Sequence, residues 1–234
     1  MKNDQLPEKG QEIVKRLRRN YRVGFEPYKV RDINLDLLKV TDLEHLLGGK
    51  DPFADVSSFP FWVKLWEAAM VLSEVMAVME PDQDKRVLEL GAGIGVPGLV
   101  AAARGFQVTL SDYEPHILDF QRVSAMASHL DNVDFRIIDW KKPPDLPPFD
   151  IILGAEILFR DEFFEPLLNV FNRYLKPGGE IYMAHDSRRQ SLPRFLNLAQ
   201  KDYEIGTRSR QMTSEDGELT ILLNRLRKRS TNTS

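Results

Sequence analysis

Three glycines at alternate positions follow an acidic residue in the segment Arg86 to Gly98, which reads RVLELGAGIGVPG. The acid is Glu89, and the glycines are Gly91, Gly93 and Gly95. Glycine lets the chain turn sharply and lets a ligand approach the backbone, because it has no Cβ. Apolar residues around the acid predict a short strand, and a proline suits the first turn of a helix after the glycines. The pattern therefore predicts a ligand-binding turn between a strand and a helix.

The chemistry of this turn depends on its ligand. Gly93, Gly95 and Gly98 also satisfy G-x-G-x-x-G, a pattern of dinucleotide-binding turns. Two features favour S-adenosylmethionine instead. Glu89 lies where it can face a cationic amine and would repel a pyrophosphate, and the glycine pattern begins two residues after that acid. A dinucleotide ligand and a glycine turn with a purely structural role are the alternatives.

Two further acids follow the next two predicted strands. Asp112 lies about twenty residues beyond the glycine turn, where a carboxylate accepts hydrogen bonds from a ribose diol, a spacing that dinucleotide enzymes share. Asp139 can accept from an adenine amino group while Trp140 packs against the ring. Two lysines and four prolines follow that pair, so this loop equally suits an exposed connector.

An acid and an aromatic residue follow the fourth predicted strand. Glu156 comes two residues after the strand at 149–154, and Phe159 lies three residues later. The acid stands where the reactive methyl group of the cofactor should point, so we expect Glu156 to bind and orient an acceptor, with proton loss to water. His185, at the end of the fifth strand, is a weak alternative base, and a histidine with satisfied hydrogen bonds is the simpler interpretation.

Two tryptophans precede the glycine turn in the stretch Phe59–Glu80, which predicts a long amphipathic helix. The expected buried face consists of Phe61, Leu65, Ala69, Leu72, Met76 and Met79. Trp62 and Trp66 lie four residues apart near the helix start. Either can close a cofactor pocket, because indole offers a flat apolar surface and one N–H donor. Core packing is the alternative for both, and it is preferred for Trp62.

The elements that position these residues alternate between strand and helix. After the turn we expect strands at 107–112, 133–138, 149–154 and 179–184, and helices at 115–128 and 161–175. Repeated βα units of this length predict a parallel sheet with helices on both faces and its ligand at the carboxyl ends of the strands. Two final strands, at 203–210 and 218–226, are joined by a short loop and must pair antiparallel. The predicted class is α/β.

The first 58 residues predict an extension packed on the core. It consists of a helix at 7–20, a hairpin at 21–40 with Pro27 near its turn, and a short helix that Asp42 caps and Gly48 and Gly49 end. Residues 59–226 form the main domain, and residues 227–234 form a basic tail. The basic end of the chain predicts a frayed, solvated terminus; its residues are Arg225, Arg227, Lys228 and Arg229.

Composition excludes several classes of protein. A formal net charge of -3 is too small to imply a nucleic-acid partner. The absence of cysteine removes disulfides, thiolate zinc sites, cysteine nucleophiles and the three-cysteine cluster of radical chemistry, so we expect no metal and a polar reaction. No apolar run reaches about 18 residues and the first residues are polar, so neither a membrane span nor a signal peptide is expected. A cytoplasmic location is the default.

Taken together, these motifs resemble those of the class I, seven-strand S-adenosylmethionine-dependent methyltransferases. The motifs are ExGxGxG, an acid at the second strand end, Asp-Trp after the third, (Asp/Glu)-x-x-(Tyr/Phe) after the fourth, and LKPGG at 175–179. Within this class, residues 59–226 are similar to the protein-lysine methyltransferases that modify chaperones, electron-transfer flavoprotein and elongation factors. Asn/Asp-Pro-Pro-aromatic, which nucleic-acid amino-methyltransferases carry after the fourth strand, is absent.

The resemblance implies a Rossmann-like sheet of seven strands and a role for each matched residue. The methionine part of the cofactor would meet Glu89 and Gly91, the ribose Asp112, and the adenine Trp140 and Asp139. The whole cofactor set is Trp66, Glu89, Gly91, Gly93, Gly95, Asp112, Asp139, Trp140 and Ala155. The target amine would meet Glu156 and Phe159. The family commonly has Asp and Tyr at these two positions, so this chain lacks the tyrosine hydroxyl.

A protein-lysine methyltransferase is therefore the preferred function. It implies a protein substrate, with no nucleic-acid or membrane partner, and a monomer is the favoured state. Three alternatives stay open: another methyltransferase on this fold with a small-molecule or protein substrate, an inactive S-adenosylmethionine-binding module, and a dinucleotide oxidoreductase.

Overall fold

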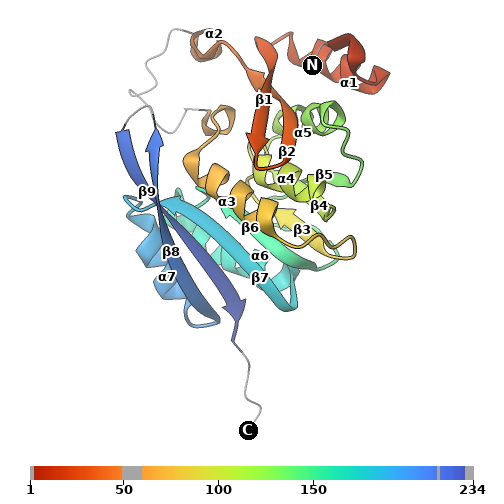
Figure 1. The fold of residues 1–234 in the computed structure, drawn as a ribbon. Coiled ribbons are helices and arrows are strands. Elements are labelled where there is room, and N and C mark those ends of the chain that lie inside the picture. The colour runs from red at the N-terminus through yellow and green to blue at the C-terminus, as the bar shows by residue number, and fades with distance from the viewer. Residues whose placement is uncertain (1–2, 49–59, 215–216, 230–234) are drawn as a thin grey trace.

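A seven-stranded sheet forms the centre of the computed structural model, which describes residues 3–48, 60–214 and 217–229 (Figure 1). The strands lie in the order β5-β4-β3-β6-β7-β9-β8. Their bounds are Arg86–Glu89 (β3), Gln107–Asp112 (β4), Val133–Ile137 (β5), Phe149–Ala155 (β6), Leu175–Asp186 (β7), Tyr203–Ser214 (β8) and Gly217–Lys228 (β9). Strands β3 to β7 pair in parallel, whereas β9 pairs antiparallel with both β7 and β8. The predicted α/β class, with its antiparallel C-terminal hairpin, is confirmed.

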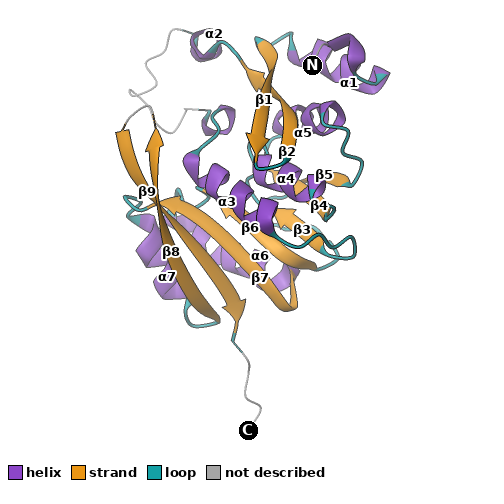
Figure 2. Ribbon diagram, viewed as in Figure 1, coloured by secondary structure: helices purple, strands orange, loops and turns teal. Residues whose placement is uncertain are grey.

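Helices cover both faces of the sheet (Figure 2). On one face lie α3 (Glu67–Val78), α4 (Val96–Ala103) and α5 (Pro115–Ala127), and on the other lie α6 (Phe164–Tyr174), preceded by the 3-10 turn η4 (Asp161–Phe163), and α7 (Ser191–Ala199). Strand β7 serves both layers, because its side chains alternate: Ala184 packs in the α3 and α4 core, and Met183 packs with α6 and α7. The short strand β3 is buried between the two layers, which is why it reads as a continuous apolar run with one acid.

The N-terminal residues form a hairpin and helices that pack on α5 (Figure 1). They form η1 (Asn3–Gln5), α1 (Glu8–Leu17), the antiparallel pair β1 (Val23–Val30) and β2 (Ile33–Val40), and α2 (Leu43–Leu47). Ser124 of α5 and Ser128, which caps the end of that helix, hold the hairpin by accepting from the backbone N–H groups of Leu38 and Asp36, respectively. Asp42 caps α2 as predicted, accepting from the His45 N–H at 2.8 Å.

The hairpin turn differs from the prediction. It lies at Arg31 and Asp32, between the paired residues Val30 and Ile33, and Pro27 lies inside β1. Tyr28 and Val30 are the more buried residues beyond the proline, and pairing extends three residues past Pro27, to Val30. Gly49 and the predicted boundary at residues 58 and 59 lie outside the described residues.

The stretch before β3 is the largest departure from the predicted elements. Residues Phe61–Val63 form a 3-10 turn, and α3 begins only at Glu67, with Trp66 as its extended N-cap. Clustered aromatic and β-branched residues are weak helix formers, and an acid such as Glu67 is favourable in the first turn. The two tryptophans therefore do not share a helix, and Phe61, expected in the core, is 41% exposed.

The basic C-terminal residues are more ordered than predicted. Strand β9 continues to Lys228. Near this end, Glu180 of β7 lies opposite Arg227 and forms an ion pair with its guanidinium. Arg225 also approaches Glu180. The carboxylate on β7 compensates these charges, so the strand pairing extends beyond the predicted end at residue 226. Residues 230–234 lie outside the described part of the chain.

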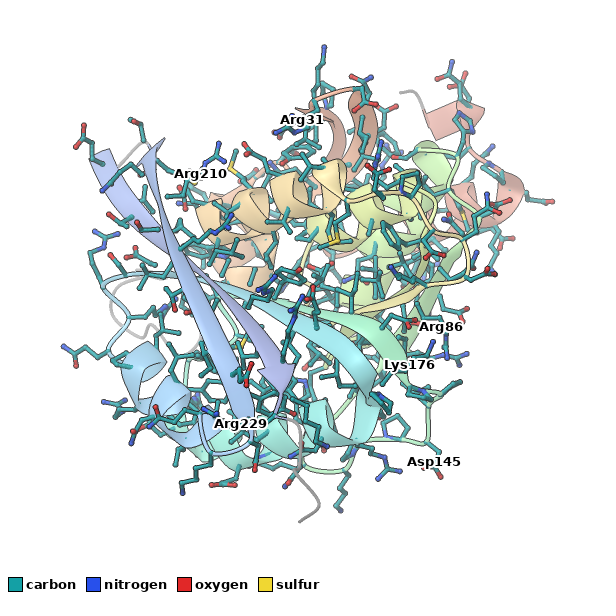
Figure 3. The ribbon with its side chains drawn as sticks, turned by 60° about the horizontal axis from the view of Figure 1, so that its bottom comes forward. Arg31, Arg86, Asp145, Lys176, Arg210 and Arg229 are labelled. Carbon is teal, nitrogen blue, oxygen red and sulfur yellow. The ribbon has the colours of Figure 1, made fainter. Side chains whose placement is uncertain are left out.

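The amino ends of the strands form a second charged edge, opposite the candidate site. Lys176 and Arg86 lie close together there (Figure 3). Asp150 links them, accepting from the Arg86 backbone N–H and from Lys176 Nζ, both at 2.8 Å. The lysine of the LKPGG motif thus ties β7 to β3 and β6.

Among the described residues, no helix has the length and apolar content needed to cross a membrane.

Candidate active site

The glycine turn joins β3 to α4 with its three alternate glycines at positive φ: 57° at Gly91, 53° at Gly93 and 79° at Gly95. Residues with a Cβ rarely adopt this conformation. Two backbone hydrogen bonds stabilise the turn. The Ala92 N–H donates to the Ser111 carbonyl at 2.9 Å, and the Gly95 N–H donates to the Ala92 carbonyl at 2.7 Å. Its position at the carboxyl end of β3 is the predicted one.

Glu89 is almost completely buried at the end of β3, with 1% of its surface exposed. Its Oε2 accepts from the Gly98 N–H in the first turn of α4 at 2.7 Å. Burial raises the pKa of this carboxyl to about 8, against the lowering effect of that N–H. The helix end is a favourable place for a negative charge, but the carboxyl is largely shielded from water. Its predicted contact with the cofactor's amine stays a prediction.

Asp112 at the end of β4 also contacts the glycine turn. Its Oδ2 accepts from the Gly93 N–H at 2.8 Å and its Oδ1 from the Tyr113 N–H at 2.7 Å. Burial raises the pKa of this carboxyl, and the backbone donors act in the opposite direction. The backbone N–H of Glu114 also acts on this carboxylate. A carboxylate has about four acceptor positions, so Asp112 retains acceptor capacity for a diol beyond these three backbone donors.

We expect Asp112→Ala to weaken cofactor binding by about 1 to 3 kcal/mol, roughly 5- to 150-fold, because it removes a charged acceptor. Calorimetric titration with S-adenosylhomocysteine measures the change. Asp112→Asn is the matched control, since its amide oxygen can still accept from Gly93 while the charge is lost; its affinity should fall between the other two. Binding of Asp112→Ala within twofold of wild type would contradict the ribose assignment.

Trp140 lies beside the glycine turn. A Cβ placed on Gly91 would come within 3.6 Å of the Trp140 indole and 3.1 Å of Ile157 Cγ2. The indole also contacts Phe159 and Phe163, with ring centroids 6.3 Å and 5.8 Å away. The residue predicted for adenine and the aromatic predicted for the acceptor therefore belong to one cluster. Phe159 is 55% exposed there.

The Asp139 carboxylate accepts from the Lys141 N–H at 2.9 Å and so stabilises the turn after β5. This geometry agrees with the connector alternative for the loop. Its contact with adenine stays a prediction.

Glu156 directly follows Ala155, the last residue of β6, and has a positive φ of 54°. Such a backbone conformation is costly for a residue with a side chain and often occurs at functional sites. The carboxylate is held on both sides: Oε1 accepts from the Asp186 N–H and Oε2 from Arg189 Nε, each at 2.6 Å. The side chain of Glu156 is 10% exposed. Sequence reasoning missed Arg189, which lies 33 residues away in a turn before α7.

The two tryptophans occupy different places. The indole N–H of Trp66 donates to the Phe61 carbonyl at 2.8 Å, so the only side-chain donor of Trp66 binds a residue of its own segment. Trp62 is the one next to the glycine turn: its backbone lies 3.5 Å from a Cβ placed on Gly93. The Trp62 ring packs on Tyr21, His116 and Phe120, in agreement with the packing preferred for it.

Gln121 of α5 is a second residue that sequence reasoning missed. It is fully buried, and its Nε2 donates to the Gly93 carbonyl at 2.8 Å. Its Cγ would also lie 3.3 Å from a Cβ on Gly95. A polar residue on the buried face of a predicted amphipathic helix was the available signal. Gln121 and Asp112 hold the carbonyl and the N–H of the same glycine.

His185 is buried in β7 and not placed as a base. Both of its ring nitrogens are without a hydrogen-bond partner among the described residues, so the expectation of a satisfied histidine is wrong. Burial, with a smaller effect from the charge of Arg189, lowers the pKa of the imidazole to about 3. The ring is therefore neutral in its apolar surroundings.

Comparison with known proteins places these features in one class. The structure of a precorrin-6y C5,15-methyltransferase from Geobacter metallireducens aligns with a TM-score of 0.56 at 15% identity, covering 70% of this chain and 88% of that one. The fold is thus that of the seven-strand methyltransferases. Residues 61–202 match the lysine methyltransferase family. The chain belongs to this family, as its motifs predict.

Two curated relatives carry different acceptors in their names. A mouse histone-arginine methyltransferase, METTL23, is 39% identical over 111 residues, which are 44% of each chain. A zebrafish protein N-lysine methyltransferase, METTL21A, is 31% identical over 149 residues, covering 60% of this chain and 68% of the relative. This chain spans about half the length of the METTL23 proteins it matches.

Proposed function

We propose that this protein transfers a methyl group from S-adenosylmethionine to a lysine side chain of a protein substrate. The observation that carries the proposal is the order of the site residues along one edge of the sheet. Asp139, Asp112, Glu89 and Glu156 lie at the carboxyl ends of four neighbouring strands, β5, β4, β3 and β6. This is the edge at which parallel α/β sheets bind ligands.

The glycine turn supports this cofactor, because Gly91 and Gly93 carry no Cβ on the sides that face Trp140 and Trp62. We propose that Asp112 binds the ribose, that Asp139 and Trp140 bind the adenine, and that Glu89, Ala155 and the glycine turn bind the rest. Trp66 stays a predicted contact of the sequence motif. The bound cofactor supplies a methyl group already activated on a sulfonium. The chain has to orient an acceptor and keep it neutral.

Exposed apolar side chains support a protein substrate. Six large apolar residues in the described part of the chain are exposed, and four of them lie near the carboxyl edge: Phe61, Tyr113, Ile137 and Phe159. Apolar groups gathered at one edge are typical of surfaces that bind a macromolecule. A groove of about 620 Å³ beside Trp140 adds to this surface, lined also by Lys141, Pro143 and residues of α6. A cytoplasmic location stays a prediction of the sequence.

Arginine is the second candidate acceptor, because METTL23 is named for it. A guanidinium is bound most strongly by a carboxylate whose two oxygens are free to form paired hydrogen bonds. Both oxygens of Glu156 already accept hydrogen bonds, one of them from Arg189. This arrangement favours lysine.

Isotope labelling tests the proposal. Purified protein is incubated with tritiated S-adenosylmethionine and a proteome extract, and acid hydrolysates of labelled bands are analysed for methylated amino acids. Methyl-lysine in a discrete band is the expected result. Label only in small molecules, or methyl-arginine alone, would support the other methyltransferases, and no label would support an inactive binding module. A thermal shift with S-adenosylhomocysteine but not with NAD excludes the oxidoreductase, since ligand at about 100 times its Kd adds ~2.7 kcal/mol.

Glu156→Ala separates cofactor binding from transfer. We expect turnover to fall about tenfold to a thousandfold, because an orienting contact is lost, while calorimetry gives cofactor affinity close to wild type. Glu162→Ala is the control: this acid is exposed, lies six residues away in η4 and pairs only loosely with Lys141 at 3.7 Å. Equal loss of binding and turnover in Glu156→Ala would move this residue into the cofactor site.

A further inference from the structure

The pairing of Glu156 with Arg189 determines the charge that an acceptor meets. The bond from Arg189 Nε to Glu156 Oε2 is 2.6 Å long, and the side chains are 35% and 10% exposed. The site therefore presents a carboxylate with a compensating cation attached, not a free carboxylate. The inference below rests on the proposed function, because it concerns how a lysine acceptor is kept reactive.

A free carboxylate would oppose the reaction. A lysine amine, with an ordinary pKa near 10.4, attacks only when it has lost its proton. A nearby negative charge favours the ammonium form, whereas a nearby positive charge favours the neutral amine. A carboxylate that binds the acceptor without a counter-charge would thus hold it in the unreactive form.

We propose that Arg189 is a positioning residue for methyl transfer: its guanidinium compensates the charge of Glu156, so that the acceptor amine binds beside this carboxylate in its neutral form. The carboxylate then orients the amine by accepting a hydrogen bond from it. The transfer step forms a nitrogen–carbon bond as the methyl–sulfur bond breaks, and the extra amine proton leaves to water.

The local backbone fixes Arg189 in this position. Arg189 occupies the tight turn after β7. Its backbone N–H donates to the Asp186 carbonyl at 3.0 Å, and the Arg189 carbonyl accepts from the Leu192 N–H at 3.2 Å. The Asp186 N–H binds the other oxygen of Glu156. One turn thus supplies both donors to the carboxylate, a neutral one and a charged one.

The other ionisable groups around the pair leave its balance intact. The Asp186 carboxylate is compensated by Arg188, whose Nε lies 3.0 Å from both of its oxygens. His185 on β7 is buried and neutral. On the side of η4 and α7, Asp161 and Arg194 form a further ion pair at 2.7 Å. Asp186 and Asp161 therefore each have a cation besides Arg189, although the charge of Arg189 also contributes to the lowered pKa of Asp186. Removing Arg189 leaves Glu156 without its ion-pair partner.

Opposite charge changes at the two residues test the proposal. The probe is the protein band that wild type labels most strongly, and turnover at saturating cofactor is measured from pH 6 to pH 10. For Arg189→Gln we expect the pH at which turnover rises to increase by about one unit. At pH values below the rise, turnover should then be roughly tenfold lower than in wild type. For Glu156→Gln we expect a shift to lower pH, with a lower maximum because the orienting charge is gone.

Three controls make the result specific to charge. Arg189→Lys keeps the cation and should restore the wild-type pH profile, at a reduced rate because it lacks the Nε donor. The double variant Arg189→Gln/Glu156→Gln should return the pH of the rise close to wild type. Arg210→Gln removes an arginine of β8 that is 53% exposed and pairs with Glu74 of α3, outside this group of charges, and should leave the profile unchanged. Calorimetry with S-adenosylhomocysteine reports whether each variant is folded.

The outcomes separate this inference from the proposed function. One outcome overturns the role of Arg189 but not the proposed function. In it, methyl-lysine forms, and the pH at which turnover rises shifts the same way in both single variants or does not shift in either. An acceptor other than lysine in the wild-type digest overturns both. Opposite shifts, with cofactor affinity within about twofold of wild type, support both.

Discussion

Gly93→Val is expected to abolish cofactor binding. Gly93 has a φ of 53°, its N–H donates to Asp112 and its carbonyl accepts from Gln121. A β-branched residue avoids this conformation, so the turn has to change shape and both hydrogen bonds with it. A side chain at position 93 would also point toward Trp62, because a Cβ on Gly93 would lie 3.5 Å from the Trp62 backbone. Calorimetry with S-adenosylhomocysteine should detect no binding at concentrations that saturate wild type.

Gly178→Val separates backbone strain from position. Gly178 has a φ of 77° in the LKPGG segment, and a Cβ there would have no neighbour within 4 Å. Both variants should lose similar stability, about 1 to 3 kcal/mol in urea unfolding. Only Gly93→Val should lose the cofactor. If Gly93→Val binds within tenfold of wild type, the glycine turn is not the cofactor cradle.

The fold follows from the sequence wherever a local pattern is strong. Strand β4 and helix α5 lie at the predicted residues to within one position, because a buried strand and an amphipathic helix have clear periods. The prediction failed at Phe61–Trp66 and at Pro27. At the first site the hydrophobic period suggests a helix, but the crowded aromatic residues form a 3-10 turn. At the second site the proline suggests a turn, but strand pairing continues through it. Tertiary contacts decide the structure at both sites.

The site is predictable in part for the same reason. Asp112 and Trp140 lie beside the glycine turn because both are at the carboxyl ends of parallel strands, and such strands end at one edge. Their contacts with ribose and adenine stay predictions. Gln121 and Arg189 act by holding Gly93 and Glu156 in place. Their contacts span 28 and 33 residues and belong to no short motif, so they become visible only once the elements are packed.

Glu89→Gln is expected to stabilise the cofactor-free protein and weaken its ligand binding. Burial raises the pKa of Glu89 from its ordinary 4.5 to about 8. Between these values the folded protein holds one proton that the unfolded chain has released, so stability falls as pH rises through this window. Glutamine keeps an acceptor for the Gly98 N–H and does not titrate. The pH slope of unfolding free energy should therefore become less negative by about 1.4 kcal/mol per unit.

Cofactor binding should change in the opposite sense, because a positive amine next to Glu89 favours its ionised form. Wild type should release a proton from this carboxyl on binding near pH 7, which calorimetry in two buffers of different ionisation enthalpy detects, and Glu89→Gln should not. Urea unfolding from pH 5 to pH 8.5 measures the stability change. Glu204→Gln, at an exposed position of β8, is the control and should leave the slope unaltered. An unchanged slope in Glu89→Gln would mean that Glu89 is already ionised in the folded state.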